Sequence, residues 1–233
     1  DTMSFIISAP ASWSGKTTVT LGLLRAISRR RSVRAAKSGP DYIDPRFHEA
    51  ACGQPCVNLD AWAMAPARIR ALAAGKTPLI VEGAMGLFDG APPDGKGATA
   101  DLARLLGLPV ILVIDAARMA GSVAPLVRGF AQFDPMVKSA GVILNNVGSE
   151  RHETMLRRAL GEVNVFGAVP RAASLKQPSR HLGLVQAQEH DDLDAYLDLA
   201  ADMVIASVNI DALLTLNTSS FPPEPSKRMP PPA

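Results

Sequence analysis

The sequence has little cysteine, little aromatic content and almost no net charge, and each scarcity excludes a class of protein. Two cysteines among 233 residues cannot form a disulfide scaffold, and only 5% of the residues are aromatic. The 24 basic residues nearly balance the 22 acidic ones, and no long basic stripe accompanies them, which argues against a nucleic-acid-binding protein. These absences favour an aliphatic domain with free thiols in a reducing compartment.

Long apolar runs are missing as well. The longest, residues 105–114, is too short to cross a bilayer, which takes ~20 residues. The N-terminus has no basic region followed by a long apolar core, so we expect no membrane contact and a cytoplasmic location. A hydrophobic fraction of 47% in a chain of this length indicates one domain with a sizeable core.

Short apolar runs alternate with segments of helical periodicity. The expected strands are residues 5–7, 33–37, 78–82, 110–115, 140–145 and 165–169. The expected helices are the segment after Lys16 and residues 66–74, 99–106, 122–133, 150–160 and 190–206. Apolar runs without polar alternation are typical of strands covered on both faces. We predict a doubly wound, mostly parallel α/β sheet over residues 1–207 and a proline-rich linker or tail over 208–233.

Residues 4–18 run from an apolar strand through small residues into Gly15-Lys16-Thr17 and a helical pattern, the order found in phosphate-binding loops. The strict spacing would place its first glycine at Pro10, so only the second half of the pattern is present. A chance Gly-Lys-Thr at a helix start is the alternative when the motif is taken alone. The strand, loop and helix order favours nucleotide phosphates.

Carboxylates follow two other expected strands. Asp41 and Asp44 lie just beyond residues 33–37, and Glu82 ends residues 78–82. Carboxyl ends of parallel strands share one crevice, and Mg²⁺ prefers a few carboxylate oxygens completed by phosphate and water. The alternative is that Asp41 forms a turn and Asp44 caps a helix before Pro45. The glycine-rich segment 83–90 could likewise be a mobile lid or a plain turn.

Several blocks together resemble the cobyrinic (or hydrogenobyrinic) acid a,c-diamide synthase family. They are A-P-A-S-W-S-G-K-T-T, K-S-G-P-D-Y-I-D-P-R-F-H, N-L-D-A-W, E-G-A-M-G-L-F-D-G, G-S-V-A-P-L-V-R-G-F, G-V-I-L-N, G-A-V-P-R and R-H-L-G-L-V. They run in order from Ile6 to Val185, and the second block is the most specific. The resemblance implies a P-loop fold of the dethiobiotin synthetase type and an ATP-dependent amidoligase.

The resemblance also implies a mechanism and a set of site residues. ATP would phosphorylate the a and c acetate carboxylates of a corrinoid, and ammonia would displace the phosphate. The implied ATP-binding residues are Ser12, Ser14, Gly15, Lys16, Thr17, Thr18, Asn145 and Arg171, and the implied Mg²⁺ ligands are Thr17, Asp44 and Glu82. Lys16, Lys37 and Asp41 would be catalytic, and Asp41, Tyr42, Asp89, Arg180 and His181 would bind the corrinoid polycarboxylate.

In this family ammonia comes from glutamine through a fused C-terminal glutaminase domain, which we expect to be absent from this chain. Neither Cys52 nor Cys56 lies in the strand-to-helix elbow that a glutaminase nucleophile needs. His48 belongs to a family block, and we expect Trp62 to pack in the core. Trp13 stands where the family usually has glycine.

The main alternative function is a switch ATPase of the partitioning or septum-positioning type, which shares the fold and dimerises around ATP. Such proteins usually carry an additional lysine early in the loop, where this chain has Ala11. We therefore favour the ligase and keep a homodimer as one possible assembly.

Overall fold

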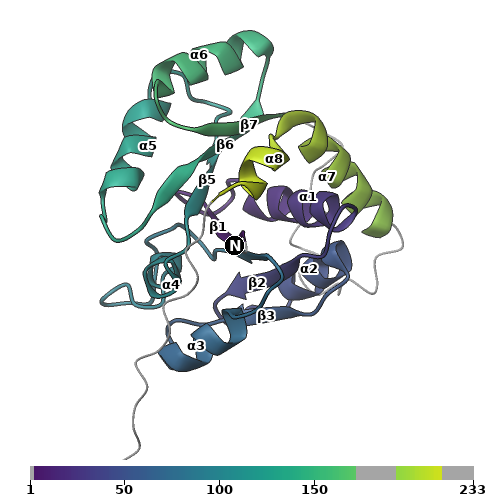
Figure 1. Cartoon of the computed structure of the whole chain (residues 1–233). Coiled ribbons are helices and arrows are strands. Elements are labelled where there is room, and N and C mark those ends of the chain that lie inside the picture. The colour runs from purple at the N-terminus through teal and green to yellow at the C-terminus, as the bar shows by residue number, and fades with distance from the viewer. Residues whose placement is uncertain (1–2, 172–192, 217–233) are drawn as a thin grey trace, which may run out of the picture.

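The computed structural model describes residues 3–171 and 193–216, and within them seven parallel strands form one sheet with helices on both faces (Figure 1). The strands are β1 (Phe5–Ser8), β2 (Arg34–Ser38), β3 (Cys56–Leu59), β4 (Leu79–Glu82), β5 (Val110–Asp115), β6 (Ser139–Val147) and β7 (Val165–Pro170). The helices are α1 (Lys16–Ser28), α2 (Asp44–Cys52), α3 (Pro66–Ala73), α4 (Thr99–Leu106), α5 (Val123–Gln132), α6 (Glu150–Leu160), α7 (Leu193–Ser207) and α8 (Ile210–Leu214).

The strand order β3-β2-β4-β1-β5-β6-β7 places β1 at the point where the winding direction reverses. Ile7 of β1 is in register with Glu82 of β4 on one side and with Ile111 of β5 on the other. The chain builds β2 to β4 on one side of β1 and then crosses to build β5 to β7. In such sheets ligands bind beside the carboxyl ends of the strands at this reversal. The predicted doubly wound fold is confirmed.

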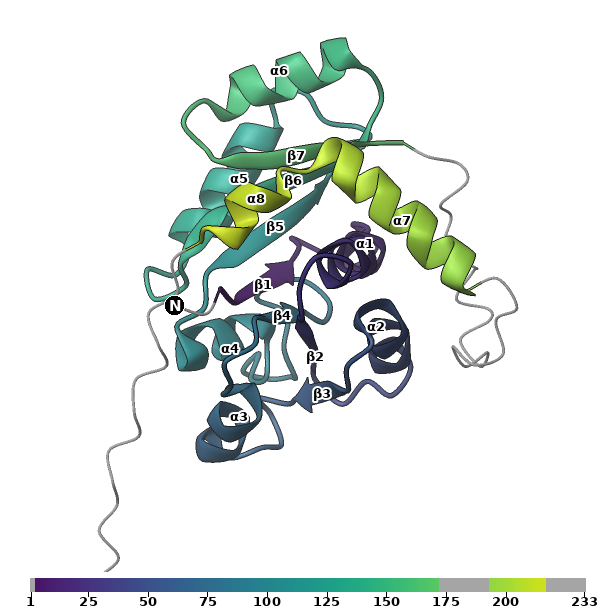
Figure 2. The ribbon, with the colours of Figure 1, turned by 45° about the vertical axis from the view of Figure 1, so that its right-hand side comes forward.

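Two apolar cores lie on the two faces of the sheet, because successive side chains of a strand point to opposite faces. Ile6 joins one core, while Phe5 and Ile7 join the other. Helices α3 to α6 cover the first face, and α1, α2, α7 and α8 cover the second (Figure 2). Burial on both faces explains why these strands show no polar alternation.

The helix that follows the phosphate loop, α1, is held against α7 by close packing and ion pairs. A Cβ at Gly22 would lie 2.5 Å from the carbonyl oxygen of Ala200, so only glycine permits this approach of the two helices. Arg25 and Arg29 both donate to the Asp198 carboxylate, at 2.9 and 2.8 Å. α7 therefore fixes the position of the helix that begins at Lys16.

The expected strands and helices do not include α2, β3 or α8, although the capping interpretation of Asp44 placed a helix start at Pro45. α2 has nine residues with Pro45 in its first turn, and the loop-forming residues before it gave no periodic signal. β3 is an edge strand of four residues whose Cys56 and Val57 are only half-buried, so it lacks the apolar run of the central strands. Among the described residues no helix is long and apolar enough to span a bilayer.

Packed structure continues beyond the expected end of the domain at residue 207. The Asn209 backbone N–H donates to the Phe166 carbonyl of β7 at 2.7 Å, and its side chain accepts from the Ala212 N–H at 2.9 Å. Ile210 and Leu213 of α8 are buried. Residues 208–216 thus belong to the packed domain, whereas residues 190–192 of the expected helix and 217–233 of the expected tail lie outside the described residues.

The contact between α1 and α7 gives a stability prediction with a matched control. We expect Gly22→Ala to destabilise the fold by about 1–3 kcal/mol, because the added methyl group meets a backbone carbonyl. Gly129 of α5 has nothing within 4 Å of an added Cβ. Gly129→Ala should therefore be neutral or stabilise by up to about 1 kcal/mol through helix propensity. Urea denaturation measures both, and equal effects would contradict the packing argument.

Candidate active site

The phosphate loop connects β1 to α1 and closes on a glycine that the geometry requires. Gly15 has a φ of 89°, and a Cβ there would overlap the Asn145 side chain from β6. The Asn145 amide donates to the Ser14 carbonyl at 3.0 Å, and the Ser14 hydroxyl donates to the Ala11 carbonyl at 2.8 Å. Asn145, expected to bind ATP, thus contacts the phosphate loop itself. One hydrogen bond within the loop and one from β6 therefore fix the conformation of the loop.

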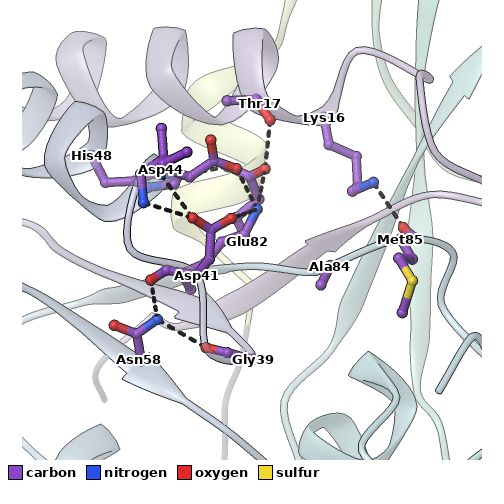
Figure 3. A network of polar contacts seen from close by, with 12 residues as sticks. Lys16, Thr17, Gly39, Asp41, Asp44, His48, Asn58, Glu82, Ala84 and Met85 are labelled. Carbon is purple, nitrogen blue, oxygen red and sulfur yellow. Dashed lines mark hydrogen bonds and ion pairs between the residues drawn. The ribbon is translucent and has the colours of Figure 1, made fainter. Parts of the chain in front are cut away.

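Lys16 points across the loop toward the segment that follows β4 (Figure 3). Its ammonium donates to the Met85 carbonyl at 2.8 Å, and the side chain is largely buried. The segment is tied down, because Leu87 N–H donates to the Ala9 carbonyl at 2.8 Å and Asp89 accepts from the Gly86 N–H at 2.8 Å. Asp89 therefore forms a turn beside the phosphate loop, one of the two interpretations of this segment.

A buried ion-pair cluster lies next to Thr17, at the carboxyl ends of β2 and β4 (Figure 3). The Lys37 ammonium lies 2.7 Å from Asp44 and 2.9 Å from Glu82, and 3.9 Å from Asp41. The Thr17 hydroxyl donates to Glu82 Oε1 at 2.7 Å. The structure thus brings together the expected metal ligands and two of the three expected catalytic residues.

Asp41 and Asp44 differ in how they enter this cluster. Asp41 Oδ1 accepts from the backbone N–H groups of Ile43 and Asp44 at 2.9 and 3.0 Å, so it forms the turn that starts α2. Its other oxygen faces Lys37. Asp44 makes no side-chain cap and instead pairs with Lys37. The turn interpretation of Asp41 is confirmed, while the capping interpretation of Asp44 is wrong.

His48 completes the cluster, and the sequence patterns did not assign it a role. Both His48 and Glu82 are fully buried, and His48 Nε2 lies 2.5 Å from Glu82 Oε2. We assign the proton to Nε2 because an ionised carboxylate can only accept. The available signal was the spacing of Asp44 and His48, four residues apart, which places both on one face of a helix.

Glu82 and Lys37 keep their charges despite burial. Burial disfavours the ionised form of Glu82, but Lys37 and His48 outweigh it and hold the pKa of Glu82 far below its ordinary value. Burial also opposes the Lys37 ammonium, yet Glu82 and Asp44 raise the pKa of Lys37 above its ordinary value. For Asp44, burial and the nearby Glu82 charge raise the pKa more than Lys37 lowers it. The single positive charge of Lys37 therefore does not balance the negative charges of the carboxylates around it.

This excess of negative charge fits a divalent cation. Asp44 Oδ1 and the lone pairs of the Thr17 hydroxyl have no hydrogen-bond donor in the part of the chain that the structure describes. The same part contains no group of three His, Cys, Asp or Glu side chains arranged to hold a metal. An ion here would need phosphate and water oxygens, which is how Mg²⁺ is usually bound.

Other expected residues lie near the crevice but make different contacts. The Thr18 hydroxyl lies 3.2 Å from the Tyr196 hydroxyl of α7. Ser12 and Tyr42 are exposed on the loops after β1 and β2, and Arg171 is exposed beyond β7. Arg180 and His181 lie outside the described residues. Thr18 thus contacts α7, and Ser12, Tyr42 and Arg171 are exposed.

Two further expectations concern cysteine and tryptophan. Burial raises the pKa of the Cys52 and Cys56 thiols, which is opposite to the activation of a nucleophilic cysteine. Trp62 is exposed and does not pack in the core, so that expectation was wrong. Its backbone is fixed because the chain at Gly97 packs against it.

The buried contact between His48 and Glu82 gives a stability prediction. We expect His48→Ala to cost about 3–5 kcal/mol, because it removes one partner of a fully buried charge. His48→Gln, which retains an N–H donor, should cost less. The matched control is His152→Ala, a half-exposed histidine whose Nε2 lies 2.7 Å from the Met119 carbonyl, with an expected loss of about 1 kcal/mol. Similar losses for both alanine variants in urea denaturation would refute the role of His48.

Comparison with solved structures finds the same fold in other proteins. A ParA family ATPase from Chlorobium tepidum TLS aligns with a TM-score of 0.51 and 13% identity, over 93% of this chain and 99% of that one. An ADP complex of a nucleotide-binding protein from Archaeoglobus fulgidus aligns with a TM-score of 0.51 and 11% identity, over 92% of this chain and 93% of that one. These similarities establish the fold alone.

Curated sequences give a closer relationship. The hydrogenobyrinate a,c-diamide synthases of Brucella anthropi and Brucella suis biovar 1 are 58% and 59% identical over 220 residues, which is 91% of this chain and 50% of each relative. That of Sinorhizobium sp is 54% identical over 228 residues. The chain spans about half the length of these relatives. Residues 5–185 match the profile described as CbiA, the CobQ/CobB/MinD/ParA nucleotide binding domain, and the chain belongs to this family.

Proposed function

We propose that this chain is the ATP-dependent part of an a,c-diamide synthase that amidates the a and c acetate carboxylates of hydrogenobyrinic or cobyrinic acid. The observation that carries the proposal is the 58% identity over 220 residues to a curated hydrogenobyrinate a,c-diamide synthase. The ion-pair cluster beside the phosphate loop supports it, because the reaction must bring a carboxylate and a polyphosphate together.

The proposed reaction has two steps for each carboxylate. A carboxylate oxygen attacks the γ-phosphorus of ATP, the bond to the β,γ-bridging oxygen breaks, and ADP leaves an acyl phosphate behind. Ammonia then attacks the acyl carbon, loses a proton and expels inorganic phosphate, which leaves the amide. We propose that the ammonia comes from glutamine, hydrolysed by a glutaminase domain outside this chain.

Lys16 and the loop N–H groups would bind the β- and γ-phosphates. Thr17 and Asp44 would hold Mg²⁺, which when bound would neutralise charge on the phosphates. Glu82 would position the Thr17 hydroxyl, from which it already accepts a hydrogen bond. Lys37 and Asp41 would face the carboxylate and the transferring phosphoryl group. Two anions repel each other on approach, so cations fixed in a buried site stabilise the transition state.

The remaining expected residues keep their proposed roles around this centre. Ser12, Ser14, Gly15, Thr18, Asn145 and Arg171 would contact the nucleotide, and Tyr42, Asp89, Arg180 and His181 would contact the polycarboxylate. Of these, Asn145 would act on ATP partly through the loop, because its amide already donates to the Ser14 carbonyl.

The alternative is a switch ATPase of the partitioning type, and the similarity to the ParA family ATPase fold favours it. That similarity comes with 13% identity, far below the identity to the curated synthases. The two functions differ in what stimulates ATP turnover: a tetrapyrrole polycarboxylate with ammonia for the ligase, and DNA or a membrane for the switch.

The first test of the ligase uses the 233-residue chain with ATP, Mg²⁺, ammonium and hydrogenobyrinic acid. We expect phosphate release that depends on the tetrapyrrole, and products whose mass matches the replacement of one and then two hydroxyls by amino groups. Lys16→Ala and Glu82→Gln should each reduce turnover at least a hundredfold, because each removes a charge from the centre. Cys52→Ser should retain ammonia-dependent activity, because burial raises the pKa of the Cys52 thiol and leaves it unactivated.

The ligase would be refuted if the tetrapyrrole left the rate of ATP turnover unchanged while DNA or lipid vesicles increased it. Full activity of Glu82→Gln would instead refute only the assignment of the cluster to the reaction centre.

A second test concerns the metal. Asp44→Asn removes the carboxylate that we propose as a direct ligand, so the Mg²⁺ concentration at half-maximal turnover should rise about tenfold or more. Asp211→Asn is the matched control, since this carboxylate of α8 is exposed and pairs with Arg30. An unchanged Mg²⁺ dependence for Asp44→Asn would show that Asp44 holds Lys37 but not the ion.

A further inference from the structure

Large apolar side chains are exposed on four loops at the carboxyl edge of the sheet. Trp13, Tyr42, Trp62 and Met85 are 75%, 79%, 61% and 51% exposed. They lie in the connections that follow β1, β2, β3 and β4, one in each. We call these four residues the apolar rim. Tryptophan is highly buried on average, so the exposure of both tryptophans of this chain requires an explanation.

The rim lies on one side of the candidate site. The four strands are consecutive in the sheet, in the order β3-β2-β4-β1, so their loops span three strand spacings, roughly 14 Å. Two of the proposed nucleotide-binding residues lie on the other side of β1: Asn145 belongs to β6, and Arg171 follows β7. The other exposed large apolar residues of the described chain are Phe133, Met136, Met155, Leu199 and Ile205, which belong to or follow helices α5, α6 and α7.

The backbone under each rim residue is fixed although its side chain is exposed. Trp62 N–H donates to Asp60 at 2.9 Å, and the Met85 carbonyl accepts from Lys16 at 2.8 Å. The Ser14 hydroxyl bonds across Trp13 to the Ala11 carbonyl at 2.8 Å. Hydrogen bonds of Asp41 form the turn that contains Tyr42. The rim is therefore preorganised for a ligand, which lowers the entropy lost on binding.

Backbone strain marks the same place. Two of the three described non-glycine residues with positive φ, Trp13 at 67° and Met85 at 50°, belong to the rim, and the third is Asn146 of β6. This left-handed region costs a non-glycine residue free energy. Such residues persist where the surrounding contacts determine the conformation, and they concentrate at ligand sites. Both conformations here occur in loops that contact each other beside Lys16.

We propose that the apolar rim binds one face of the tetrapyrrole macrocycle, and so determines which polycarboxylates this enzyme accepts. This inference rests on the proposed function. A large ring with apolar faces and carboxylates at its periphery could cover several rim residues while one acetate reaches Lys37. A nucleobase or a small dicarboxylic acid would cover at most one or two of them. The rim would thus recognise the apolar ring, whereas the ion-pair cluster offers only charged groups for a carboxylate.

The test measures binding of hydrogenobyrinic acid to the 233-residue chain by equilibrium dialysis in the presence of ADP and Mg²⁺. We expect Trp62→Ala to raise the dissociation constant about tenfold, the loss expected for one large apolar side chain, and Met85→Ala to raise it about threefold. Trp62→Phe should stay within about twofold, since it retains an aromatic face. In steady-state turnover KM for the tetrapyrrole should rise with kcat little changed.

Met136→Ala is the matched control, because Met136 is similarly exposed in the connection from α5 to β6, at the opposite edge of the sheet. It should leave the dissociation constant unchanged. Trp13 belongs to the phosphate loop, so the affinity of Trp13→Ala for ADP is measured as well. We expect the substitution to weaken ADP binding less than tetrapyrrole binding.

The outcomes separate the rim from the proposed function. If the unmodified chain binds the tetrapyrrole and Trp62→Ala binds it equally well, the rim proposal is overturned while the ligase stands. If the unmodified chain binds no tetrapyrrole, both proposals fail. Equal loss of ADP and tetrapyrrole affinity in Trp62→Ala would also overturn the rim, because the effect would then be structural.

Discussion

The fully buried carboxylate of Glu82 is the constraint on which the candidate site depends. A carboxylate without partners in an apolar interior would take up a proton or destabilise the fold, because desolvation penalises its charge. Here its oxygens accept hydrogen bonds from Thr17 of α1, Lys37 of β2 and His48 of α2. The phosphate-loop helix and the β2–α2 unit must therefore hold fixed positions relative to β4. The contacts that stabilise the fold at this point are also the ones that arrange the chemistry.

Sequence patterns predicted the central part of this arrangement because its signals are local. Lys16 and Thr17 stand at a strand-to-helix junction, and Glu82 ends an apolar run. His48 could not be found in the same way, since its partner lies 34 residues away and α2 is short. The pairing of Lys37 with two carboxylates likewise depends on β2 and β4 being neighbours, and that strand order is set by the whole sheet.

Trp62 shows a different limit of sequence reasoning. The preference of tryptophan for the core is an average over many proteins, and it says nothing about a residue held in a loop by its backbone. At Trp62 the hydrogen bond that its backbone N–H donates to Asp60 and the close approach of Gly97 fix the main chain, while the ring stays exposed. Exposure of this kind becomes visible only when loops from four strands are placed at one edge of the sheet.

The site also suggests how one fold can serve different reactions. The fold is shared with a ParA family ATPase at 13% identity, so the fold cannot by itself define a ligase. The residues that surround Lys37 and Glu82 here come largely from one segment, the end of the β2–α2 loop and the start of α2, which contributes Asp41, Asp44 and His48. Glu82, together with Asp44 of this segment, raises the pKa of Lys37 and keeps it charged in a buried position. Under the proposed function, the segment after β2, rather than the phosphate loop, converts a nucleotide-binding fold into one that activates a carboxylate.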